Sequence, residues 1–253
     1  SMRTEKITFA GGSGAPLEGR LDLPAQAAPR AYAVFAHCFG CTKNLKTIAF
    51  MDRALAEAGI GVLRFDFTGL GESEGVFADT NFTSNVLDIA AAAGMLEAQH
   101  EAPRLLIGHS LGGAACLMAA RHIPSVAAIA TIASPASLGH LEEIILSKAP
   151  EIEAAGEAQV ELMGRRFHLK KQFLDDLRDQ SMSRILAELK TPLLILHAPE
   201  DRVVPISAAE RIFSLARHPK SLVALDRGDH LMLDEEDARY AGQIIAAWFS
   251  RYL

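Results

Sequence analysis

The sequence has 253 residues, of which 49% are hydrophobic, and its formal net charge is −6. This length and apolar content fit one large domain that buries a substantial core. The mild negative charge argues against nucleic acid as a partner. No apolar run approaches the length of a membrane span, and the first residues contain no hydrophobic signal region, so we expect no membrane association.

Cysteine is rare, with Cys38, Cys41 and Cys116 as the three examples. An odd and small number in a chain of this size favours a reducing compartment over a disulfide framework. We therefore expect a cytoplasmic protein. Cys38 and Cys41 have no obvious second pair of ligands, so we expect no zinc site, and we expect no other metal or cofactor.

Strands and helices alternate along most of the chain. Two strands over residues 3–9 and 17–23, separated by a glycine-rich stretch, predict an antiparallel hairpin. Further strands are predicted at 31–36, 60–65, 126–133, 192–196 and 221–225, and helices at 46–58, 82–99, 206–217 and 238–252, with a strand and helix together over 104–122. This rhythm predicts an α/β fold with a mostly parallel, doubly wound sheet of about eight strands.

One segment, residues 135–189, breaks this rhythm because it contains no buried strand. It predicts a polar helix near 138–154, a small hairpin around Gly164 and a helix over 170–177. An insertion between two core strands, on the side where active-site loops gather, is typical of a lid. We therefore expect a single domain over residues 2–253 that includes a lid insertion over residues 135–189.

The strongest functional motif follows the apolar run that begins at Leu105. The sequence Gly-His-Ser-Leu-Gly at 108–112 stands between this run and a helix-forming stretch, as a nucleophile elbow requires. We predict that Ser110 is the nucleophile and that Gly108 and Gly112 avoid collisions with the neighbouring strand and helix. The N–H of Leu111 begins the helix and is predicted to face a developing oxyanion.

A serine nucleophile needs a base and a group that orients the base. Asp201 and His230 each lie just beyond a predicted strand, in the chain order Ser, Asp, His that a doubly wound hydrolase uses. We therefore predict that His230 is the base and Asp201 its orienting carboxylate. Among the competing residues, His109 and His197 are expected to pack beside the strands, and Glu200, Asp226 and Asp229 are expected to point away or to lie too close to the base.

The second oxyanion donor is expected in the loop after the strand at 31–36. This loop reads His37, Cys38, Phe39, Gly40. We assign the donor to the N–H of Phe39, whose ring is free to pack in the core because only the backbone takes part in the chemistry.

Taken together, these residues resemble the α/β-hydrolase superfamily of serine esterases over nearly the whole chain. Residues 66–73 are similar to the Asp-x-x-Gly-x-Gly-x-Ser turn of that superfamily, whereas residues 37–38 read His-Cys where the family has His-Gly. The resemblance implies an esterase with a small-molecule ester substrate. The insertion resembles the small lid of cinnamoyl and feruloyl esterases, and with the basic Arg165, Arg166, Lys170 and Lys171 it favours small or aromatic acyl groups over lipid chains.

A narrower resemblance concerns the His-Cys-Phe-x-Cys motif at 37–41, together with residues 65–75 and Ala-Asp-Thr-Asn-Phe at 78–82. These motifs are similar to the hydrolase half of proteins that fuse this fold to an OsmC-like peroxidase domain. The sequence stops at Leu253, so we expect no such domain here, but the resemblance implies a functional link to an OsmC-like peroxidase. The sequence also leaves open whether the protein forms a homodimer with a second copy of itself.

Two other classes of function stay open. Cys38 and Cys41 form a Cys-x-x-Cys between a strand and a helix, which is typical of a thiol-redox protein. A binding module that keeps the fold without the chemistry is the other. If the pair is instead regulatory, we expect a disulfide or an adduct there to displace the Phe39 N–H and to lower esterase activity.

Overall fold

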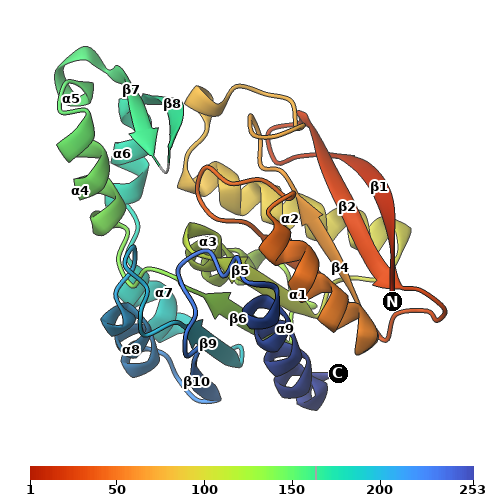
Figure 1. Cartoon of the computed structure of the whole chain (residues 1–253). Helices are drawn as coiled ribbons and strands as arrows, with labels where there is room; N and C mark the ends of the chain where they lie inside the picture. Colours follow the sequence, from red (N-terminus) through yellow and green to blue (C-terminus); the bar gives the residue numbers. More distant parts are fainter. Residues whose placement is uncertain (163) are drawn as a thin grey trace.

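The computed structural model describes residues 1–162 and 164–253. In this part of the chain an eight-stranded sheet has the order β1-β2-β4-β3-β5-β6-β9-β10 (Figure 1). The β1–β2 and β2–β4 pairs are antiparallel, and every later pair is parallel, which confirms the predicted fold class. The strands are β1 (Met2–Ala10), β2 (Pro16–Pro24), β3 (Ala31–Ala36), β4 (Ile60–Phe65), β5 (Leu105–His109), β6 (Ala128–Ile132), β9 (Leu193–His197) and β10 (Lys220–Ala224).

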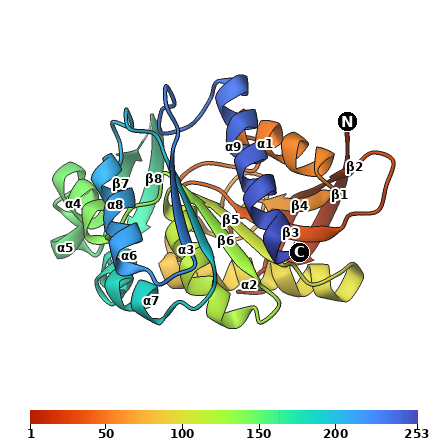
Figure 2. The same ribbon diagram turned by 90° about the horizontal axis from the view of Figure 1, so that it is seen from below.

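Helices cover both faces of this sheet (Figure 2). On one face α1 (Lys46–Glu57) and α9 (Glu235–Phe249) pack against an apolar cluster, and on the other face α2 (Phe82–Gln99), α3 (Leu111–Ala119) and α8 (Ile206–Leu215) pack against a second cluster. Every residue of β3, β4 and β5 is buried, as strands with apolar layers on both sides require. The sheet therefore presents its carboxyl ends as a rigid platform.

The greater part of the insertion over residues 135–189 lies beside this platform, at the upper left of Figure 1. It contains α4 (Gly139–Lys148), α5 (Ile152–Ala155), a separate hairpin of β7 (Glu157–Leu162) and β8 (Arg165–Lys170), then α6 (Lys171–Arg178) and α7 (Met182–Glu188). The predicted hairpin is present, although its Met163 lies outside the described residues. The single helix predicted over 138–154 is instead two, because Pro150 disfavours helical geometry at Ala149.

Several element ends differ from the prediction. The last helix starts at Glu235, three residues before the predicted start, because the Asp234 side chain accepts a hydrogen bond from the Asp237 N–H and caps it. Neither α7 nor the short 3₁₀ helix η1 (Phe77–Asp79) was predicted, whereas η2 (Ala120–His122) and η3 (Ser250–Tyr252) are 3₁₀ turns at the ends of helices that were predicted to continue to residues 122 and 252. Within the described residues, no helix combines the length and the apolar character needed to cross a membrane.

Candidate active site

Ser110 stands on a strained turn between β5 and α3. Its φ of 56° and ψ of −123° lie in a region that non-glycine residues rarely adopt. A Cβ added at Gly108 would lie 2.4 Å from the Gly112 carbonyl oxygen, and one added at Gly112 would lie 2.3 Å from the Ala36 oxygen. Both glycines therefore have the steric role predicted for them, since helix and strand approach the turn too closely for any side chain.

His230 and Asp201 are brought together from loops that follow β10 and β9. His230 Nδ1 donates to Asp201 Oδ2 over 2.8 Å, and Asp201 Oδ1 accepts from the N–H groups of Val203 and Val204, each over 2.8 Å. Burial opposes ionisation of Asp201, but the hydrogen bonds from His230 and from these two N–H groups outweigh it and lower its pKa. This geometry fits a carboxylate that fixes the ring and tautomer of His230.

Two further buried histidines hold the backbone around this pair. His109 Nε2 donates to the carbonyl oxygen of His230 over 2.7 Å, and His197 Nε2 donates to that of Val204 over 2.8 Å. Burial and the nearby His230 lower the pKa of His109 to about 4, which keeps its ring neutral. Both side chains pack beside their strands as predicted, but their contacts with the site loops were missed.

The other acidic candidates take no part in orienting His230. Glu200, Asp226 and Asp229 are all exposed. Asp229 Oδ1 accepts from the Met232 N–H over 2.7 Å, a contact within its own loop. Of the carboxylates considered from the sequence, Asp201 is the one in hydrogen-bond contact with His230.

Ser110 and His230 line one cavity of about 100 Å³. Phe39 and Leu111 line it as well, and within the described residues neither of their N–H groups donates to a protein acceptor. Two such N–H groups in one cavity with a serine hydroxyl form an arrangement that can bind an anionic oxygen. All five residues predicted for the site therefore lie near one another. Asp201 is hydrogen-bonded to His230, and His230 lines the same cavity as Ser110, Phe39 and Leu111.

The Phe39 N–H is oriented by a four-residue turn from Cys38 to Cys41. The Cys38 carbonyl oxygen accepts from the Cys41 N–H over 3.0 Å and from His37 Nδ1 over 2.8 Å. Because a trans peptide directs its N–H opposite to its C=O, fixing this carbonyl also fixes the direction of the Phe39 N–H. Burial lowers the pKa of His37 to about 4, so the ring stays neutral, and Nδ1, which faces a carbonyl, carries the proton. This role of His37 was not predicted.

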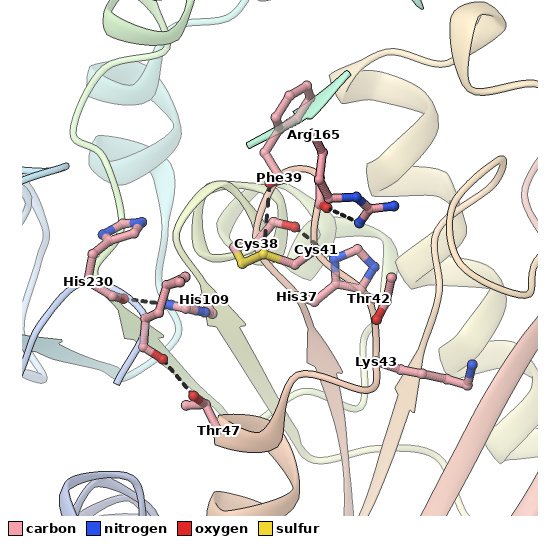
Figure 3. The surroundings of a disulfide bond; sticks show 12 residues. His37, Cys38, Phe39, Cys41, Thr42, Lys43, Thr47, His109, Arg165 and His230 are labelled. Carbon is pink, nitrogen blue, oxygen red and sulfur yellow. Dashed lines mark hydrogen bonds between the residues drawn. A yellow bond between two sulfur atoms is a disulfide. The ribbon is translucent and has the colours of Figure 1, made fainter. Parts of the chain in front are cut away.

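A disulfide between Cys38 and Cys41 closes the same turn (Figure 3). The expectation of a chain without disulfides is therefore wrong for this pair, because the turn brings their Cα atoms to 5.2 Å. Cys116 is free and buried. The disulfide and the hydrogen-bonded turn are present together, and the expectation that the disulfide displaces the Phe39 N–H stays a prediction.

These features define an α/β-hydrolase with a nucleophile elbow. A model of the alpha/beta hydrolase family matches residues 33–243, and the chain belongs to this family. The chain is similar to the esterase domain of a Rhodothermus marinus protein, with 44% identity, coverage of 99% of both chains and a TM-score of 0.82. Ferulic acid-bound Est1E from Butyrivibrio proteoclasticus shares the fold at 20% identity, covering 97% of this chain and 99% of that one, with a TM-score of 0.78.

A further relative is a thioesterase. The mitochondrial palmitoyl-protein thioesterase ABHD10 of Mus musculus is 26% identical over 77% of this chain and 66% of its own length. The family is thereby established, and the relatives include an esterase domain and a thioesterase.

Proposed function

We propose that this protein is a serine hydrolase that cleaves carboxylic esters with small or aromatic acyl groups through an acyl-enzyme. Ser110 is the nucleophile, His230 the base and Asp201 the group that orients it, while the N–H groups of Phe39 and Leu111 form the oxyanion hole. The observation that carries the proposal is the cavity lined by Ser110 and His230, which also contains these two unpaired donors.

The reaction follows from this arrangement. His230 uses Nδ1 for Asp201, so Nε2 is the atom that removes the proton from Ser110 as its oxygen attacks the ester carbonyl. The tetrahedral oxyanion accepts from Phe39 and Leu111, and its collapse releases the alcohol with the proton from His230. Water then attacks the acyl-enzyme with His230 again as base, and the carboxylic acid leaves.

The apolar walls and the small volume of the cavity support the preference for small or aromatic acyl groups. Leu141, Ile144 and Leu162 from the insertion and Val203 and Val204 from the Asp201 loop give it an apolar lining. An apolar cavity of roughly 150 Å³ holds one benzene molecule, so about 100 Å³ fits a short chain or part of one ring. The esterase domain at 44% identity supports ester cleavage, and the resemblance to cinnamoyl and feruloyl esterases supports aromatic acyl groups.

The test is hydrolysis of p-nitrophenyl esters from C2 to C16 by the parent and by Ser110→Ala. We expect C2–C4 esters to be cleaved fastest, with turnover lost in the variant. Its free energy of unfolding should change by under about 1 kcal/mol, because little volume is removed. Unaltered turnover in Ser110→Ala would contradict the nucleophile, and faster cleavage of C12–C16 esters would contradict the acyl preference.

The same assay separates the other functions. Acyl thioesters of matching chain length test the thioesterase alternative that the ABHD10 relative represents. A thiol-redox protein or a binding module predicts no Ser110-dependent hydrolysis of any ester or thioester. The link to an OsmC-like peroxidase and the cytoplasmic location stay predictions from the sequence.

A further inference from the structure

The turn that carries the Phe39 N–H is held from outside by the insertion. Arg165, at the start of β8, donates from Nη1 to the Gly40 carbonyl oxygen over 2.7 Å (Figure 3). The neighbouring ring of Phe167 lies against the same glycine, since a Cβ added at Gly40 would lie 2.7 Å from Phe167 Cζ. Strand β8 therefore contacts Gly40 twice: Arg165 is hydrogen-bonded to its carbonyl oxygen, and the Phe167 ring packs beside its Cα.

The Phe39 side chain reaches the same surface. Its ring centroid lies 5.9 Å from that of Phe167 and 5.5 Å from that of Phe173, both in the insertion, and 5.8 Å from that of Phe77 in η1. Packing of this kind restrains the ring and, through it, the Cα of Phe39. The insertion thus contacts the side chain of Phe39 and the backbone of the next residue.

These contacts bear on the direction of the Phe39 N–H. The peptide before Phe39 is fixed through the Cys38 carbonyl, and the peptide after Gly40 is fixed through the Gly40 carbonyl. Gly40 has a φ of +72°, and the Cys41 N–H of the Gly40–Cys41 peptide donates to the Cys38 carbonyl, so the Gly40 carbonyl on the opposite side of that peptide points out of the turn and needs a partner from outside it. Arg165 supplies that partner.

We propose that Arg165 is a positioning residue of the oxyanion hole, so that the insertion supports transition-state stabilisation as well as covering the cavity. This inference rests on the proposed function. Arg165 lines no part of the cavity with Ser110 and acts through the turn, so its loss is expected to weaken the oxyanion contact without weakening substrate binding.

The experiment compares Arg165→Gln and Arg165→Lys with Arg166→Gln. Arg166 is the adjacent exposed arginine, and within the described residues its side chain makes no hydrogen bond, which makes it a matched control for charge. Removal of a whole oxyanion donor costs about 10²–10³-fold in kcat, so a displaced donor should cost about tenfold. We expect this loss in Arg165→Gln with KM within about twofold, partial recovery in Arg165→Lys, and parent values in Arg166→Gln.

A second readout is independent of turnover. The backbone amide signal of Phe39, assigned by its disappearance in Phe39→Tyr in protein labelled with ¹⁵N-phenylalanine, should shift in Arg165→Gln and stay in place in Arg166→Gln. An unchanged kcat and an unmoved amide in Arg165→Gln would overturn the inference, as would an equal response in the Arg166 variant. If the parent shows no Ser110-dependent hydrolysis, the proposed function fails, and the amide signal alone decides whether Arg165 positions the turn.

Discussion

Two loops meet at Ser110, and the protein anchors them by different means. The histidine loop, residues 226–234, is held by the body of the fold, by which we mean the eight-stranded sheet and the helices α1, α2, α3, α8 and α9 that pack on it. The carbonyl oxygen of His230 accepts from His109 in β5, and the Thr47 hydroxyl of α1 lies 2.6 and 2.9 Å from the Leu231 and Met232 carbonyl oxygens. All of these partners belong to elements packed on the central sheet.

The oxyanion loop, residues 37–45, takes much of its support from outside the central sheet. Its turn is closed by the Cys38–Cys41 disulfide and gripped by Arg165 of the insertion. It is tied to the body as well: at its start the Phe67 N–H donates to His37 Nε2 over 3.4 Å, and at its far end the fully buried Lys43 ammonium lies 2.6 Å from Asp66 Oδ2. Under the proposed function, general base catalysis would therefore rest on the body of the fold, whereas oxyanion stabilisation would depend also on the insertion and on a covalent link.

The largest expected effect comes from breaking the histidine side. His230→Ala should lower kcat by about 10⁴–10⁶-fold, nearly as much as Ser110→Ala, because triad members act as a unit. Asp201→Asn should cost somewhat less, about 10³–10⁴-fold, because the ring then takes the wrong tautomer. Steady-state kinetics on p-nitrophenyl acetate measure both, and the Ser110→Ala/His230→Ala double variant should be no worse than either single one. A silent Asp201→Asn would contradict the orienting role of Asp201.

A smaller loss of kcat is expected when the Cys38–Cys41 disulfide of the oxyanion loop is removed. Cys38→Ser/Cys41→Ser should lower kcat about tenfold with KM nearly unchanged, since a small misplacement of a transition-state donor is costly. Dithiothreitol should do the same to the parent: its two thiols give two electrons and two protons to the disulfide, which becomes two thiols, and diamide should reverse the change.

The control for this redox test is Cys116→Ala. Burial raises the pKa of the Cys116 thiol, so it should not react, and this variant should respond as the parent does. An equal response of the parent and the double serine variant would show that the link is irrelevant. Higher activity after reduction would instead support the sequence-based expectation that the disulfide disturbs the oxyanion hole.

The comparison also separates what the sequence could predict from what it could not. Ser110, Asp201 and His230 each follow a strand, and parallel strands bring their carboxyl ends together, so local pattern and topology sufficed to predict that these residues lie near one another. The anchors were missed because they join residues far apart in the chain, 121 positions for His109 and His230 and 125 for Arg165 and Gly40. A hydrogen bond from a side chain to a backbone carbonyl far away in the chain produces no regular residue spacing by which the sequence could predict it.

The fold was predictable to a similar depth. Periodicity and glycine signals predicted the sheet, the hairpin of the insertion and the helix that ends before Gly59. Pro150 was a readable signal for two helices instead of one, and it was overlooked. α7 is seven residues long, with only Met182 and Leu186 buried, which is too short a pattern for helical periodicity to stand out.

On the histidine side, Thr47→Val should have a mild effect. It removes one hydroxyl and keeps the shape, which leaves two buried carbonyls without that donor, so it should destabilise the protein by about 1–2 kcal/mol. We expect kcat to fall only about threefold, because His109 and Asp201 still hold His230. Chemical denaturation and kinetics measure the two effects, with Thr191→Val, at a half-buried threonine outside both loops, as the control. A loss of kcat as large as that of Cys38→Ser/Cys41→Ser would contradict the stated difference between the loops.

The smallest effect on catalysis is expected at Asp52, on α1, the helix that also carries Thr47. Asp52 is fully buried, its oxygens have no hydrogen-bond partner within the described residues, and Arg64 Nε is 3.8 Å away. Arg64 also donates to the Lys43 carbonyl oxygen at the end of the oxyanion loop. Burial, with the nearby Asp22, raises the pKa of Asp52 well above its usual value. Asp52 therefore offers a test of whether the ionisation of a buried carboxyl in the body of the fold changes the function of the histidine loop or of the oxyanion loop.

A carboxyl whose pKa is raised by folding contributes its full stability below the pKa of the unfolded chain and loses it as pH rises through the folded value. Asn cannot ionise, so the Tm of Asp52→Asn relative to the parent should rise between pH 5 and pH 9, by at least about 2 °C for each kcal/mol involved. Because both loops keep their own anchors, kcat should stay within about twofold of the parent. Asp179→Asn, at an exposed carboxyl outside both loops, is the matched control. A relative Tm that falls with pH would show that Asp52 is stabilised as the anion by Arg64, and a large loss of kcat would show that the body supports the oxyanion loop more than the comparison allows.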